Sequence, residues 1–254
     1  MTTATTAPRH ASPVSRVVNV MKLHFANPQT TIVFPWMIMG FIFLVNLAIW
    51  SILFAALPPA DRADTADGLQ YSGAASFIFV YMMVVAIQAI SITFPFAQGY
   101  GVTRRDFYLG SALTFVVLAA MYTAGLTILS VIEEATGGWG FGGRMFTAIY
   151  FGDSTAQRVF IYFVAFLFFF FVGSVIATMW VRWKATGVTI FFAALTLLLV
   201  AAAALITFTG NWPLIGQFFV TAGLVGSYAW SLVLTAIAAV TGFFILRRAT
   251  PRAA

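Results

Sequence analysis

The chain has 254 residues, of which 61% are hydrophobic and only 8% are charged, with a net charge of +6. An ordinary soluble domain has about 25% charged residues, so this chain has too little polar surface to cover a soluble globule. Long apolar runs without polar alternation predict an all-α, polytopic membrane protein, because a bare backbone in lipid must satisfy its own hydrogen bonds. The sequence contains no cysteine, which excludes disulfides, thiolate catalysis and cysteine metal sites.

The segment before the first apolar run divides into two parts. Residues 1–12 are rich in Thr, Ala and Pro and are predicted to be a disordered cytoplasmic tail. Residues 13–28 predict an amphipathic interfacial helix on the inner membrane surface. Its apolar residues are Val14, Val17, Val18, Met21 and Phe25, with Arg16, Asn19 and Lys22 on the other side. A short cytoplasmic extension of the first span is the alternative, but Asn27 and Pro28 favour a break.

Six apolar runs reach the roughly 20 residues that a helix needs to cross a bilayer. They extend from Thr31 to Leu57, Ser76 to Gln98, Phe107 to Ile132, Val159 to Val181, Val188 to Phe208 and Leu224 to Leu246. We therefore predict one transmembrane domain of six helices over residues 29–248, followed by a cytoplasmic tail at 249–254.

The basic residues are distributed unequally between the two sides of these spans. Ten of the thirteen fall in the N-terminus, the second loop, the fourth loop or the C-terminus: Arg9, Arg16, Lys22, Arg104, Arg105, Arg182, Lys184, Arg247, Arg248 and Arg252. Only Arg62, Arg144 and Arg158 fall on the opposite side. The positive-inside rule therefore predicts a plasma-membrane protein with both termini in the cytoplasm. The positive charge indicates contact with anionic membrane lipid rather than with nucleic acid.

The three external connections differ in character. Residues 58–75 are polar and acidic, which is typical of a solvated loop. Residues 133–158 combine glycine-rich turns with apolar residues, so part of this segment is predicted to rest on the membrane surface. Residues 209–223 are apolar but too short to span, and predict a re-entrant or interfacial turn of helix before the last span.

The residues that could carry chemistry are few. No ionisable residue lies in the central part of any span, where such groups usually mark ion or proton paths. Glu133 and Glu134 end the third span and are interpreted as a solvated helix end, since the arginine and histidines that accompany paired glutamates in CAAX-type intramembrane proteases are missing. His10 and His24 both precede the first span, so no metal site is predicted. Serines in the spans have no base at matching depth, so no catalytic residue is predicted.

Polar, uncharged side chains do occur in the middle of two spans. These are Asn46 in the first span and Gln88, Ser91 and Thr93 in the second. They could hydrogen-bond to neighbouring helices or line a path for a solute, and both interpretations stay open.

The most distinctive segment joins the second and third spans, from Phe94 to Gly110. Gly99 and Gly101 allow the chain to turn, and Thr103 and Asp106 have the spacing of a capping box for a new helix. A tight loop that obeys the positive-inside rule is an adequate explanation of this segment by itself.

This segment also resembles the loop after the second span in ABC-2-type transporter permeases. A Gly-Val-Thr/Ser-Arg-Arg sequence followed by an aromatic residue and Leu-Gly is typical there. The resemblance implies a cytoplasmic coupling elbow that docks on an ATP-binding subunit. In this chain the elbow consists of Gly101, Val102, Thr103, Arg104, Arg105 and Asp106.

The resemblance further implies the membrane subunit of an ATP-driven exporter. The wholly apolar and aromatic spans favour a hydrophobic or amphipathic substrate over an ion. Neither Lys22 nor Lys184 follows a phosphate-binding loop, so ATP and Mg²⁺ are expected in a separate ATP-binding cassette ATPase subunit and no cofactor in this chain. A second copy of the permease, or a paralogue, is the other expected partner. An ion-coupled secondary transporter or channel, and an accessory membrane protein without transport activity, are the alternatives.

Overall fold

The computed structural model describes residues 12–249, so the predicted tails at residues 1–11 and 250–254 lie outside the described part. Within that part the chain forms only helices and turns. The α-helices are α1 (Pro13–His24), α2 (Phe34–Ala56), α3 (Arg62–Leu69), α4 (Phe77–Gly99), α5 (Arg104–Ala135), α6 (Thr155–Thr209) and α7 (Trp212–Arg247). Short π- and 3-10 turns cover Gln29–Val33, Pro59–Asp61, Ala74–Ser76, Gly138–Gly142 and Ile149–Phe151. Five helical stretches are long and apolar enough to cross a membrane, so the chain is an α-helical membrane protein.

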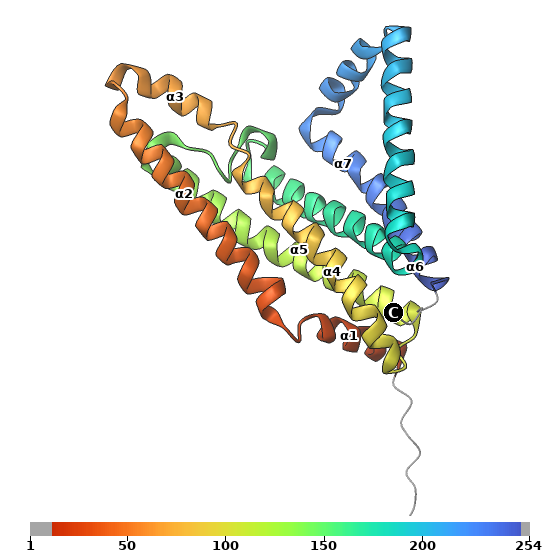
Figure 1. Ribbon diagram of the computed structural model, residues 1–254. Helices are drawn as coiled ribbons and strands as arrows, with labels where there is room; N and C mark the ends of the chain where they lie inside the picture. Colours follow the sequence, from red (N-terminus) through yellow and green to blue (C-terminus); the bar gives the residue numbers. More distant parts are fainter. Residues whose placement is uncertain (1–11, 250–254) are drawn as a thin grey trace, which may run out of the picture.

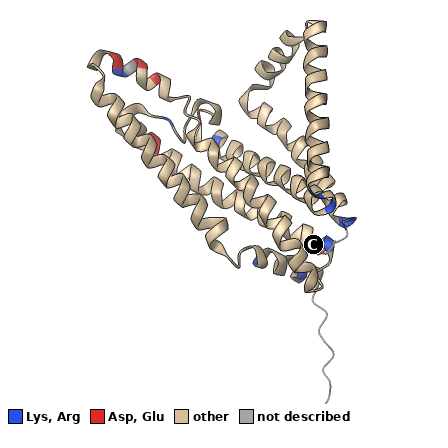
Figure 2. Cartoon of the chain, viewed as in Figure 1, with Lys and Arg blue, Asp and Glu red and all other residues tan. Residues whose placement is uncertain are grey.

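The helices α2, α4 and α5 and the first half of α6 run side by side as a bundle (Figure 1). Both ends of the described chain lie at one end of this bundle, beside the turn between α4 and α5. Figure 2 shows most acidic residues at the opposite end, on and near α3, whereas most basic residues lie at the end with the termini. The bundle therefore separates charge along its length, as the sequence predicts. We call its two ends the basic end and the acidic end.

Helix α1 is separate from the first long helix, as predicted. Ser12 caps its first turn by accepting a hydrogen bond from the backbone N–H of Ser15 at 3.2 Å. After His24 the chain turns, and the side chain of Asn27 accepts from the backbone N–H of Gln29 at 3.2 Å. Figure 1 shows α1 lying across the end of the bundle. The alternative of a simple extension of the first span is therefore wrong.

The predicted connection between the fourth and fifth apolar runs is a sharp break rather than an extended loop. It lies at Lys184, whose φ of 57° and ψ of −155° interrupt α6 and are unusual for a residue with a side chain. Every buried residue of α6 lies between Arg158 and Met179. The second arm, residues 185–209, forms with the first part of α7 a hairpin that stands away from the bundle (Figure 1). The last part of α7 packs on the bundle, where Leu246 is buried and the Tyr108 hydroxyl donates to the Ala239 carbonyl oxygen at 2.7 Å.

The helix α7 also has two arms. Gly223 interrupts it with φ 64° and ψ −177°, a conformation that glycine adopts at little steric cost. The predicted start of the last span at Leu224 agrees with this break. A helical arm over residues 212–222 precedes it, as predicted, and the re-entrant or interfacial position of this arm stays a prediction.

The bundle is held together by close approach between α4 and α6. A side chain at Gly173 of α6 would place its Cβ 2.5 Å from the backbone carbonyl oxygen of Met83 in α4. The rings of Phe79 and Phe166 meet nearby, with centroids 4.6 Å apart. Small residues at helix contacts in membranes permit this kind of approach.

We therefore expect Gly173→Ala to destabilise the protein by about 1–3 kcal/mol, because α4 and α6 must separate to admit the methyl group. Thermal unfolding of the detergent-solubilised protein measures the effect. Gly40→Ala is the matched control, since a Cβ at Gly40 of α2 would meet nothing within 4 Å. Equal midpoints for Gly173→Ala and wild type would contradict the close approach of these helices.

Candidate functional site

The turn between α4 and α5 is a compact elbow built from local hydrogen bonds. Gly101 adopts φ 76°, which reverses the chain after α4. The side chain of Gln98 donates to the carbonyl oxygen of Val102 at 2.7 Å. Thr103 Oγ1 then accepts from the backbone N–H of Asp106 at 3.1 Å, and α5 begins at Arg104. The predicted N-terminal cap at Thr103 is confirmed.

Asp106 has a different role from the one that the sequence predicts. Its carboxylate accepts from Arg16 Nε of α1 at 2.8 Å, and the Asp106 side chain is only 8% exposed. It is thus an anchor for α1 and not a group at the surface of the elbow. The second half of the predicted capping box is not formed, because the carboxylate turns toward α1 instead of the preceding backbone.

Two further contacts fix α1 on α5. Val20 is buried against Gly110, where an added Cβ would lie 2.5 Å from the Val20 Cβ. His24 Nε2 lies 2.8 Å from Ser111 Oγ, and burial lowers the pKa of His24 to about 4. The face of α1 that packs on α5 therefore includes Val20 and His24, whereas Val14 of the predicted apolar stripe stays 72% exposed.

The rest of the elbow is accessible. Gly101, Thr103 and Arg105 are exposed, and Val102 and Arg104 are half-buried. Arg104 Nη1 donates to the backbone carbonyl oxygen of Arg247 at 3.2 Å, which ties the elbow to the end of α7. A cavity of about 610 Å³ opens beside this contact, lined by Arg16, Thr103, Arg105, Asp106, Leu109, Phe243 and Arg247. The elbow thus connects α1, α5 and α7 at the basic end.

The four polar residues predicted for a solute path do not converge. Asn46 Nδ2 donates to the Ile42 carbonyl oxygen at 2.9 Å, and Ser91 Oγ donates to the Ile87 carbonyl oxygen at 2.7 Å, each within its own helix. Gln88 is exposed and Thr93 is half-buried, both on α4. The four side chains make no hydrogen bond to one another. Their assignment to a substrate path stays a prediction.

The acidic end holds a polar site that sequence reasoning missed. Glu133, near the end of α5, is 1% exposed, so its interpretation as a solvated helix end is wrong. Its carboxylate accepts from the backbone N–H groups of Met145, Phe146 and Thr147 at 2.8–3.2 Å. It also accepts from the Thr147 hydroxyl and from Trp139 Nε1, each at 2.7 Å.

The segment held by Glu133 covers the end of the bundle. Met145, Phe146 and Phe151 are each buried, and the hydroxyl of Tyr162 donates to the Phe146 carbonyl oxygen. The prediction that the apolar residues of this segment rest on the membrane surface is wrong for these three. These residues can be buried because the Glu133 carboxylate accepts hydrogen bonds from backbone N–H groups of the same segment.

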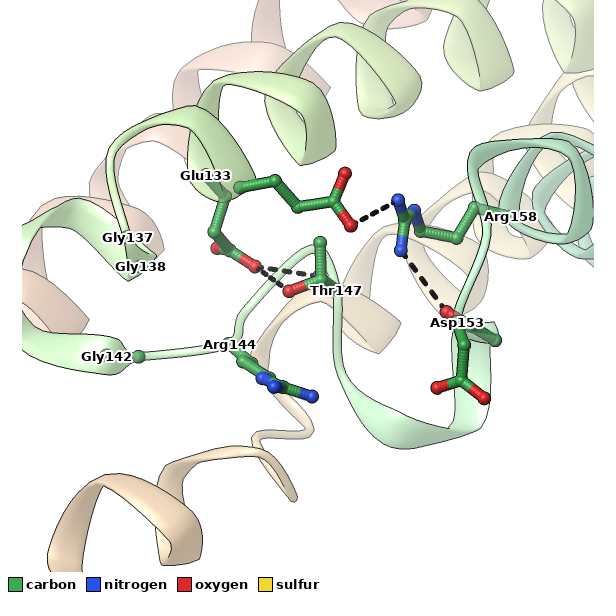
Figure 3. Close-up of a pocket in the computed structure, with 11 residues that line it drawn as sticks. Glu133, Gly137, Gly138, Gly142, Arg144, Thr147, Asp153 and Arg158 are labelled. Atoms are coloured by element: carbon green, nitrogen blue, oxygen red, sulfur yellow. Dashed lines mark hydrogen bonds and ion pairs between the residues drawn. The ribbon is translucent and has the colours of Figure 1, made fainter. Parts of the chain in front are cut away.

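The adjacent Glu134 forms an ion pair with Arg158 of α6, with Oε1 and Nη2 2.6 Å apart (Figure 3). Arg158 is 2% exposed, whereas Glu134 is 46% exposed. The pair borders a cavity of about 520 Å³ whose lining includes Glu133, Arg144, Thr147 and Asp153.

One pattern in the sequence could have indicated this buried polar site. It is the glycine-rich turn and apolar run that directly follow the two adjacent glutamates.

Comparisons with models of protein families, with curated proteins and with solved structures gave no match to this chain. Its functional residues are therefore argued from geometry and from the sequence.

We expect Glu133→Gln to destabilise the protein by about 2–5 kcal/mol, because an amide nitrogen would face at least two buried donors in either orientation, at about 1–3 kcal/mol each. The thermal unfolding midpoint in detergent measures this change. Asp64→Asn, at an exposed position of the same end, is the control and should leave the midpoint unchanged. Equal midpoints for the two variants would show that Glu133 does not hold the covering segment.

Proposed function

We propose that this chain is the membrane subunit of an ATP-driven ABC transporter, and that it exports a hydrophobic or amphipathic substrate. The observation that carries the proposal is the elbow, whose half-buried Arg104 and exposed Arg105 lie where α1, α5 and α7 meet. A partner that moves this elbow would act on three helices at once. The local resemblance of residues 101–110 to ABC-2-type permeases supports the same assignment.

The proposed topology has six spans with both termini in the cytoplasm. A straight helix of 55 residues, the length of α6, would extend about 80 Å, far more than the roughly 30 Å of a bilayer core. The break at Lys184 divides it into two arms that are each long enough for one crossing. It also places Arg182 and Lys184 at the same end as the elbow, where the positive-inside rule expects them.

The proposed partners follow from what the chain lacks. Hydrolysis of ATP with Mg²⁺ requires a phosphate-binding loop, which this sequence does not contain, so it belongs to a separate ATP-binding cassette subunit. Of the four residues predicted for the substrate path, Asn46 and Ser91 donate hydrogen bonds within their own helices and Gln88 is exposed. A path between this chain and a second permease copy or a paralogue is therefore proposed.

Reporter fusions test the topology. Reporters placed after Arg105 and after Arg248 should be cytoplasmic, and reporters near Asp64 and Asp153 should be external, because ten of the thirteen basic residues lie on one side. Accessibility to a membrane-impermeant label gives an independent measurement. A reporter at Arg105 on the external face would contradict six spans.

Charge reversal tests the coupling role of the elbow. We expect the double variant Arg104→Glu and Arg105→Glu to lose co-purification of the ATP-binding cassette ATPase and to lose transport, while membrane insertion is retained. Single exposed ion pairs contribute only about 0–1 kcal/mol, so both residues are changed together. Asp106 is left intact because its substitution would also release α1.

The matched control is Lys22→Glu with Arg248→Glu, which makes the same change in charge at two exposed basic residues of the basic end outside the elbow and its cavity lining. This control should keep the ATPase. If the elbow variant binds its ATPase and transports like the control, the elbow is an ordinary positively charged loop. If no such ATPase co-purifies with the wild-type chain, the transporter assignment is wrong.

An ion-coupled transporter or channel is the second candidate. It is disfavoured because the carboxylates of the chain lie at the two ends of the bundle, with Asp106 and Glu133 both committed to structural contacts. An accessory membrane protein without transport shares the topology. Transport measured with and without the ATPase separates these functions.

A further inference from the structure

The cavity at the acidic end contains hydrogen-bond donors that the protein does not use. Arg158 is 2% exposed, yet its Nε has no acceptor among residues 12–249. Its Nη1 donates to the Gly152 carbonyl oxygen at 3.3 Å, and its Nη2 donates to Glu134 and, at 3.4 Å, to Thr155 Oγ1. A buried guanidinium with an unsatisfied N–H is costly, and Arg158 lines the cavity, so an acceptor that entered the cavity and reached this guanidinium would be favoured.

A second arginine borders the same cavity. Arg144 is exposed and forms no ion pair or hydrogen bond within the described part of the chain. Figure 3 shows the Arg144 side chain extending from the loop that also carries Thr147, whereas Arg158 comes from a separate segment. The Arg158 guanidinium is paired with Glu134. Two arginines on one cavity can hold the oxygens of a carboxylate or phosphate, for which their planar donor groups are suited.

The carboxylates around the cavity restrict which anion can bind. Glu133, Glu134 and Asp153 carry three formal negative charges, against two positive charges on Arg144 and Arg158. Glu133 is saturated by hydrogen bonds and Glu134 is paired, but the Asp153 side chain is exposed and has no partner among residues 12–249. A simple anion would meet net negative charge here, whereas a ligand that also carries an ammonium group would satisfy Asp153.

We propose that this cavity binds a zwitterionic group, with the carboxylate or phosphate of the ligand at Arg144 and Arg158 and its ammonium group at Asp153 and the free oxygen of Glu134. The volume of about 520 Å³ admits an amino acid or a phosphoethanolamine group. A free solute and the head group of a phosphatidylethanolamine lipid share this chemistry. The proposal does not depend on an ATPase, so it can fail or succeed independently of the proposed transport function.

The first experiment measures the thermal unfolding midpoint of the purified full chain with phosphoethanolamine, glycine, ethanolamine or inorganic phosphate. Binding to the folded state raises the midpoint with ligand concentration. The two zwitterions should raise it at concentrations at which ethanolamine and phosphate have little effect. If phosphate alone is as effective as phosphoethanolamine, or if no zwitterion raises the midpoint, the proposal is wrong.

The second experiment separates the two halves of the site with exposed residues whose replacement should not affect folding. Arg144→Gln should lower the affinity for the zwitterions about tenfold, because it removes a charged donor. Asp153→Asn should lower the affinity similarly, because it removes the partner of the ammonium group. Arg62→Gln, at an exposed arginine of the same end outside the cavity lining, is the control. The proposed site is wrong if zwitterions raise the unfolding midpoints of Arg144→Gln and Asp153→Asn as much as that of Arg62→Gln.

A third comparison identifies the source of the group. In nanodiscs, a lipid ligand should give a higher midpoint with phosphatidylethanolamine than with phosphatidylglycerol, and Arg144→Gln should abolish the difference. A free solute should instead act equally in both nanodiscs. Both results support the zwitterion site, whereas a preference for phosphatidylglycerol contradicts it.

Discussion

Helices that meet inside a membrane gain little from the hydrophobic effect, because lipid chains are as apolar as the side chains themselves. Adhesion between them therefore depends on close van der Waals contact, and in this chain that contact is made by the first arm of α6. Gly173 brings α6 onto the backbone of α4, and Phe170 stacks on Phe115 of α5 with centroids 5.2 Å apart. The buried part of α6 ends at Met179, and its second arm stands away from the bundle.

Charged groups are confined to the ends of this apolar core, and at each end a carboxylate of α5 fixes a peripheral segment. Asp106 binds Arg16 and so attaches α1, while Glu133 accepts from three consecutive backbone N–H groups and so attaches the covering segment. A carboxylate with several hydrogen-bond donors can be buried, whereas the same group within the spans would lack such donors. The charged residues of this protein therefore stabilise the two ends of the bundle, although the middle of each span has none.

Local sequence signals predicted the helices well, and the partners of their polar residues poorly. The cap at Thr103 and the break at Gly223 depend on neighbours within a few residues, so composition and turn chemistry were sufficient. Asp106 and Arg16 are 90 positions apart, and Glu134 and Arg158 are 24 apart, so no pattern along the chain pairs them. Hydropathy indicates which segments are apolar but not which face packs on a neighbour. For the same reason α1 was predicted correctly as a helix while its packed face was not.

Both carboxylates lie on one helix, so α5 connects the two ends of the bundle. This helix has 32 residues without a break, which is about 48 Å at 1.5 Å per residue, and it begins at the elbow and ends at the glutamate pair. A displacement applied at Arg104 or Arg105 is transmitted along a continuous hydrogen-bonded rod, since bending it would require distortion of its backbone. The Glu134–Arg158 pair links the far end of this rod to α6 at the cavity. Movement of the elbow relative to α6 would therefore alter the spacing of Glu134 and Arg158, which connects events at the basic end to the geometry of the cavity at the acidic end.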